Sequence, residues 1–179
     1  MIDVEGSELL ERLPFLQKLM LLTDGSMTLL LEIYTGHPVV VETLTQKIIM
    51  ANEDIALRLG VALGDSVNYR EVILKDGTTD RPLLYAISLA PLSRLTDEFR
   101  EDLLRADIPI GKIMKIHGLE FRRELVAIGK ERATGRVIQI FGLDEGEYIL
   151  KRVYNIIHRK EILISIMEAF PASAYLEVI

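Results

Sequence analysis

The chain has 179 residues, 49% of them hydrophobic and 27% charged, a balance typical of a soluble globular protein. Its formal net charge is −6 and no block of Lys or Arg stands out, which argues against a nucleic-acid or anionic-membrane partner. Cysteine is absent, so disulfides, zinc-thiolate sites and thiol nucleophiles are excluded.

The start of the chain, MIDVEGSELLERL, is acidic and lacks the basic segment and long apolar core of a signal peptide. No run approaches the roughly 18 uninterrupted apolar residues of a membrane span. We therefore expect a cytoplasmic protein. No low-complexity tract or linker divides the sequence, so we expect one domain over residues 1–179.

Helical leucine spacing begins the chain, over residues 7–22. Ser7 is the predicted N-cap, and Pro14 is expected to start a second helical segment. A short helix follows, for which Ser26 is the expected N-cap and Gly36 the expected end.

Strand-like and helical segments then alternate along the middle of the chain. Residues 39–49 predict a strand, and two more strands are expected around the turn signal Asp76-Gly77, in NYREVILK and PLLYAISLA. The segment 52–65 is ambiguous, because two glycines interrupt a weak helical pattern. A helix capped by Thr96 is expected over LTDEFREDLLRAD, followed by a short irregular or helical link, IPIGKIMKIHG.

Four strand-like runs finish the chain, and short turns join them. These runs are LEFRRELVAIG, RVIQIFG, EYILKRVYNII and ILISIMEAF. Short connections make neighbouring strands antiparallel, because parallel pairing needs a long crossover. The predicted fold class is therefore α+β with an antiparallel sheet.

The last run carries one carboxylate, Glu168, among apolar residues. Side chains alternate along a strand, so one face is expected to hold Ile162, Ile164, Ile166, Glu168 and Phe170. An unpaired ionised carboxylate is costly to bury. Such a glutamate should be matched by a cation, kept protonated or placed in a cavity.

A charged residue of opposite sign ends another apolar face. Arg70 shares a strand face with Val72 and Leu74, so Arg70 and Glu168 could line one apolar pocket that binds a small ligand with an anionic end. Alternatively, both side chains reach solvent at strand ends, or they pair with each other. Arg152 is a rival cation for Glu168.

Other patterns favour no specific chemistry. DGSMT places backbone N–H groups at a helix start, where an anion can bind, although capping is the commoner use. His37, His117 and His158 show no metal-ligand spacing, so we expect surface or turn histidines and no metal site. The sequence also lacks GxSxG, GxxxxGK[ST] and GxGxxG.

Taken in order, several segments resemble chorismate pyruvate-lyase and the broader group of chorismate-lyase-like proteins. The matching pieces run from about residue 14 to 175, and they are LLTDGSMTLLLE, VVVETL, YREVILKDG, the AP of SLAP, IPIG and MEAFPASAY. UTRA effector-binding domains of bacterial transcription regulators share the fold of this group. The resemblance implies an antiparallel sheet with helices on one side and a ligand enclosed beneath helical flaps.

The resemblance also implies functional residues and a reaction. The family's ligand contacts fall on Met27, Arg70, Ile110 and Glu168, with Arg70 binding a ring carboxylate and Glu168 acting as a general acid or base. The implied reaction eliminates pyruvate from chorismate to give 4-hydroxybenzoate, without a cofactor. The alternative is a UTRA-like domain that binds a small aromatic or cyclohexadiene carboxylate without chemistry. The sequence leaves the oligomeric state open.

Overall fold

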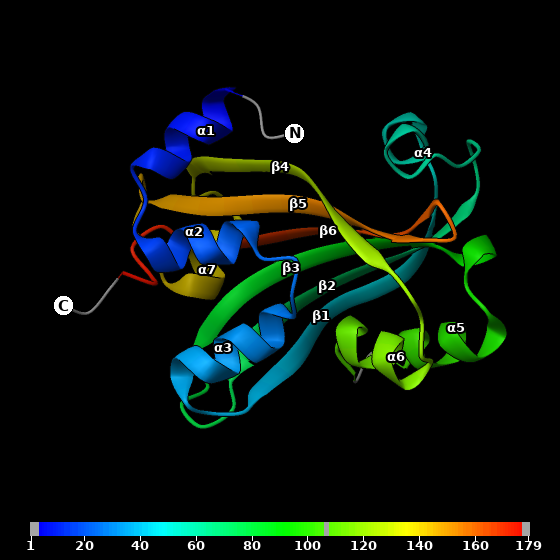
Figure 1. Ribbon diagram of the computed structural model, residues 1–179, viewed down its shortest axis with the longest axis horizontal. Coiled ribbons are helices and arrows are strands. Elements are labelled where there is room, and N and C mark those ends of the chain that lie inside the picture. Colours follow the sequence, from blue (N-terminus) through cyan, green and yellow to red (C-terminus); the bar gives the residue numbers. More distant parts are fainter. Residues whose placement is uncertain (1–3, 106–107, 177–179) are drawn as a thin grey trace.

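The computed structural model describes residues 4–105 and 108–176, and within these residues six strands form one sheet in the order β1-β2-β3-β6-β5-β4 (Figure 1). All neighbouring strands are antiparallel, which confirms the predicted α+β class. The strands are β1 Val39–Met50, β2 Ser66–Asp76, β3 Pro82–Pro91, β4 Arg122–Arg132, β5 Tyr148–His158 and β6 Glu161–Pro171.

Helices cover both faces of this sheet, most of them on the face that carries Arg70 and Glu168, which we call the front face. The front-face helices are α1 Val4–Glu11, α2 Phe15–Leu22, α3 Met27–Thr35, α5 Asp97–Leu104 and α6 Ile110–Ile116. The back face is covered in part by α4 Glu53–Leu59 and α7 Arg136–Phe141. None of the helices in the described part of the chain is long and apolar enough to cross a membrane.

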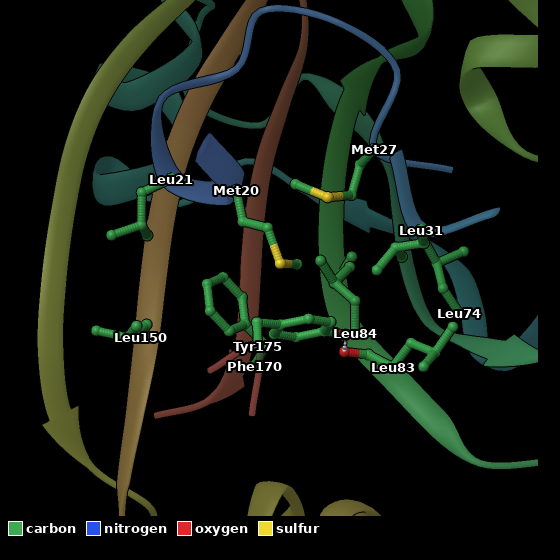
Figure 2. Packing of buried hydrophobic residues seen from close by; sticks show 11 residues of the cluster. Met20, Leu21, Met27, Leu31, Leu74, Leu83, Leu84, Leu150, Phe170 and Tyr175 are labelled. Carbon is green, nitrogen blue, oxygen red and sulfur yellow. Dashed lines mark hydrogen bonds between the residues drawn. The ribbon is translucent and has the colours of Figure 1, made fainter. Parts of the chain in front are cut away.

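Apolar packing joins the front-face helices to the sheet in two clusters. Figure 2 shows the first, in which Met20 of α2 lies beside Phe170 of β6 and Leu31 of α3 belongs to the same cluster. Tyr175, just beyond β6, donates a hydrogen bond from its hydroxyl to the Leu83 carbonyl at 2.5 Å. The second cluster lies at the other end of the sheet, where Phe99 of α5 and residues of α6 pack on β5 and β6. These two clusters hold the helices that flank the candidate site.

Several helix ends are confirmed as predicted. The Ser26 hydroxyl accepts a hydrogen bond from the Leu29 N–H at 3.3 Å, and Gly36 ends α3 in the left-handed conformation. Thr96 caps α5 in the same way, through the Phe99 N–H. The prediction for Ser7 is wrong, because Ser7 lies inside α1 rather than at its start.

The strand predicted over residues 136–142 is also wrong, since these residues form α7. A short apolar run does not distinguish a strand from a helix by periodicity, and here the left-handed Gly142 ends the segment as a helix. Arg136 binds the buried Glu71 carboxylate on the back face, with Nη1 and Oε2 2.7 Å apart. This ion pair and the apolar packing of α7 hold the helix on the sheet.

A bulge in β6 corrects one part of the predicted strand face. Ile156 pairs with Ile164, whereas the next residue of β5, Ile157, pairs with Ile162, so β6 has one extra residue, Leu163. Ile162 therefore packs with the back-face cluster under α4, and Ile164 packs on the front. Glu168 lies beyond the bulge and stays on the front face.

Candidate active site

A pocket lies on the front face of the sheet, between the strands and the first turns of α3 and α6. It encloses about 650 Å³, including the part of its mouth that is open to solvent. Strands β2, β3, β5 and β6 supply its floor, and apolar side chains such as Val72 and Ile166 cover most of it. Ala86 and Ser88 stand at the centre of the floor, and these small residues leave room above β3.

Arg70 is buried at the β2 side of this pocket, with only 2% of its surface exposed. Its Nη1 donates to the Ile108 carbonyl at 3.0 Å, and its Nη2 donates to the Thr43 hydroxyl at 3.4 Å. The first contact joins the sheet to the segment just before α6. The guanidinium is therefore held in place at the pocket wall and is always charged.

Glu168 lines the same pocket from β6, and its cation is Arg152, the neighbouring residue on β5. Arg152 donates from Nε to Glu168 Oε2 at 2.7 Å, and the Tyr154 hydroxyl donates to Oε1 at 3.0 Å. Glu168 and Arg152 are 5% and 1% exposed. The glutamate is thus both paired with a cation and placed at a cavity, and the rival Arg152, not Arg70, is the paired cation.

Two further contacts fix the geometry around Glu168. Arg152 Nη1 donates to the Thr23 carbonyl at 2.8 Å, and its guanidinium carbon lies 4.8 Å from the centre of the Tyr154 ring. Burial, together with the nearby Glu168 carboxylate, raises the pKa of Tyr154 well above its usual value of 10.0. Tyr154 therefore keeps its proton and acts as a hydrogen-bond donor at neutral pH.

The first turns of α3 and α6 form the roof of the pocket. Met27 and Thr28 line it from α3, while Pro109, Ile110 and Gly111 line it from the start of α6. The first N–H groups of a helix have no partner inside that helix, and the helix dipole favours an anion beside them. The starts of α3 and α6 therefore place backbone N–H groups beside the pocket.

The sheet register gives the spacing between the two charged ends. Arg70 pairs with Ser88 and Glu168 pairs with Ala86, so the two residues flank β3 and are offset by one side-chain repeat. Two interstrand spacings and one repeat of about 7 Å place their backbones roughly 12 Å apart. Arg70 and Glu168 therefore reach the pocket from opposite sides of β3.

All four residues predicted for the site, Met27, Arg70, Ile110 and Glu168, line this one pocket. Their roles in binding and chemistry stay predictions. Tyr154, which sequence reasoning missed, lies two residues after Arg152, so strand alternation places both on the face that carries Glu168.

The sequence reasoning also missed Arg123, which lines the β4 side of the pocket. Two adjacent arginines begin the β4 segment, and the pattern did not show which of them faces inward.

The histidines lie away from this pocket and pair with other groups. His37 Nδ1 and Asp76 Oδ2 are 2.9 Å apart, His117 Nε2 and Asp102 Oδ2 are 2.8 Å apart, and His158 contacts a backbone carbonyl. Over residues 4–105 and 108–176, no three His, Asp or Glu side chains cluster as metal ligands would.

Sequence comparison identifies the family. The family model described as Rv2949c-like chorismate pyruvate-lyase matches residues 21–177. The chain belongs to this family. A relative from Methanocaldococcus jannaschii, named "Putative lyase MJ0807", is 38% identical over 159 residues, which cover 86% of this chain and 77% of the relative.

Solved structures with the same fold include a GntR-family transcriptional regulator from Bacillus cereus, with a TM-score of 0.61 at 16% identity over 79% of this chain and 96% of that one. PhnF from Mycobacterium smegmatis matches with a TM-score of 0.71 at 17% identity, over 87% of this chain and 67% of PhnF. The separate PhnF effector domain matches with a TM-score of 0.70 at 18% identity, over 87% and 93% of the two chains. At such low identity these matches show the fold alone, and they confirm the expected likeness to effector-binding domains.

Proposed function

We propose that this protein eliminates pyruvate from chorismate and releases 4-hydroxybenzoate. One observation carries the proposal: Arg70 and Glu168 line the same apolar pocket beneath two helix starts, with their backbones about 12 Å apart across the sheet. Membership of the Rv2949c-like chorismate pyruvate-lyase family supports it.

The reaction balances without water, an oxidant or a reductant. The ring carbon that bears the hydroxyl loses its proton, and the neighbouring carbon loses its enolpyruvyl ether oxygen. The ring becomes aromatic, and the leaving enolate gains a proton at its methylene carbon to become pyruvate. Aromatisation drives the reaction, so the protein mainly orients the substrate and transfers a proton.

Arg70 binds the ring carboxylate in this scheme. A guanidinium offers parallel N–H groups that match the two oxygens of a carboxylate, and its contacts with Ile108 and Thr43 hold it in position. The N–H groups of Met27 and Ile110, at the starts of α3 and α6, supply further donors.

Glu168 takes the proton from the ring. It already accepts hydrogen bonds from Arg152 and Tyr154, so it is suited to accept a proton rather than donate one. A carboxylate has about four acceptor positions, so two remain for the substrate hydroxyl and the ring proton. Arg152 and Tyr154 act as positioning residues, because they fix the orientation of the carboxylate.

A second function from another class is binding of an aromatic acid without chemistry. The observation in its favour is the fold shared with the effector domain of PhnF. Both functions use Arg70 for the ligand carboxylate, but only the lyase needs Glu168 to transfer a proton.

Incubation of the purified protein with chorismate separates the two functions. The lyase should release pyruvate and 4-hydroxybenzoate in equal amounts. A coupled dehydrogenase assay measures the pyruvate, and liquid chromatography measures the 4-hydroxybenzoate. Saturable binding of 4-hydroxybenzoate with no release of either product would instead favour the binding function.

A further inference from the structure

Arg123 of β4 lines the pocket at the side opposite to Arg70. It pairs with Ile156 of β5, whereas Arg70 lies on β2, so β3, β6 and β5 separate the two arginines. Four interstrand spacings place their backbones about 20 Å apart. Both long side chains reach the same cavity from its two ends, and Glu168 lies between them.

One buried N–H donor of Arg123, at Nε, has no hydrogen-bond partner among the described residues. Nη1 of the same side chain donates to the Asp24 carbonyl at 2.7 Å, and the guanidinium carbon lies 5.0 Å from the centre of the Phe121 ring. A buried N–H without a partner is costly, and a ligand oxygen at this end of the pocket removes that cost.

The charges around the pocket indicate how many anionic groups its ligand carries. The charged side chains that line it, within the described residues, are Arg70, Arg123 and Glu168. Glu168 is already neutralised by Arg152. Arg123 places a second guanidinium at the end of the pocket opposite to Arg70, which matches a ligand with two separated carboxylates better than one with a single carboxylate.

We propose that Arg123 binds the second carboxylate of the substrate, the one on the enolpyruvyl side chain. This inference rests on the proposed lyase function. With the ring carboxylate on Arg70 and the ring hydroxyl at Glu168, the side chain next to that hydroxyl extends past Glu168 toward β5 and β4. Arg123 thus selects chorismate over aromatic acids that carry one carboxylate, such as the product 4-hydroxybenzoate.

The test compares Arg123→Met with Arg122→Met. Methionine keeps most of the length of the side chain but removes the charge, and Arg122 is the exposed neighbour that pairs with Glu124 instead of lining the pocket. Three quantities are measured for each variant: the kinetics with chorismate, the Kd for 4-hydroxybenzoate by calorimetry, and the binding of chorismate in competition with 4-hydroxybenzoate.

For Arg123→Met we expect KM for chorismate to rise about 10- to 100-fold, the range for loss of a charged hydrogen bond. The Kd for 4-hydroxybenzoate should stay within about twofold, since one carboxylate needs only Arg70. Arg122→Met should match the wild type in both. Thermal denaturation confirms that each variant is folded.

Other outcomes separate the possible failures. Unchanged kinetics with chorismate in Arg123→Met would overturn the inference and leave the lyase proposal standing. Equal weakening of both ligands would also overturn it, because Arg123 would then only hold the loop at Asp24 in place. Binding of chorismate without turnover in the wild type would remove the lyase proposal, yet the competition assay would still measure the contribution of Arg123. A wild type that neither converts nor binds chorismate overturns both.

Discussion

Replacement of Arg152 with Met tests how much the buried cation beside Glu168 contributes to the stability of the fold. The change removes the 2.7 Å contact from Nε to Glu168 Oε2 and the 2.8 Å contact from Nη1 to the Thr23 carbonyl. Glu168, only 5% exposed, then keeps a hydrogen bond from Tyr154 but has lost its cation.

The expected cost is large. Removing one partner of a buried ion pair lowers the free energy of unfolding by about 3–5 kcal/mol, because the remaining charge stays buried without compensation. In a chain of this length each kcal/mol lowers the melting temperature by about 2–4 °C, so a drop of roughly 6–20 °C follows. Lys151→Met is the matched control, because the partly exposed Lys151 pairs with Glu131 at the surface and should lose less than about 1 kcal/mol.

Urea unfolding of the wild type, Arg152→Met, Glu168→Gln and the double variant measures this coupling. The double variant removes the stranded charge, since the glutamine oxygen can still accept from Tyr154. It should therefore be about 2 kcal/mol more stable than the sum of the two single losses predicts. Additivity within about 0.5 kcal/mol, or a loss below 1 kcal/mol in Arg152→Met, would refute the reasoning.

Two further predictions concern Tyr154 and Asp76. Tyr154→Phe should lower kcat with chorismate several-fold and change KM little, since it removes one donor from Glu168; an unchanged kcat would contradict its positioning role. For Asp76, the hydrogen bond from His37 holds the carboxyl pKa well below its usual 3.8, so its contribution to stability is present above about pH 4 and is lost as the pH falls. Urea midpoints between pH 7 and pH 2 should therefore decline less steeply in Asp76→Asn, and an equal decline would count against this.

Strand alternation was enough to place Arg70 and Glu168 on the front face, because every second residue of a strand points the same way. It did not identify the cation that Glu168 binds. The turn at Arg159-Lys160 pairs His158 with Glu161, and that register alone would place Met167 opposite Arg152. The bulge at Leu163 shifts the register by one residue and brings Glu168 there instead.

Arg123 and α7 show the same limit of sequence reasoning. The β4 segment contains a second bulge, between Leu125 and Ala127. Counting every second residue along β4 therefore does not keep to one face of the sheet. The six apolar and polar residues of α7 fit either a strand or a helix. Contacts distant in sequence decide the outcome, in particular the ion pair of Arg136 with Glu71.

Glu168→Gln under single-turnover conditions tests the central claim most directly. Glu161→Gln is the control, because Glu161 lies on the same strand but is exposed and lines no part of the pocket. If Glu168 takes the ring proton, pyruvate release from chorismate should slow by at least about 100-fold in Glu168→Gln and stay unchanged in Glu161→Gln. Both should still bind 4-hydroxybenzoate. A rate within threefold of the wild type in Glu168→Gln would contradict the assignment of Glu168 as the proton acceptor.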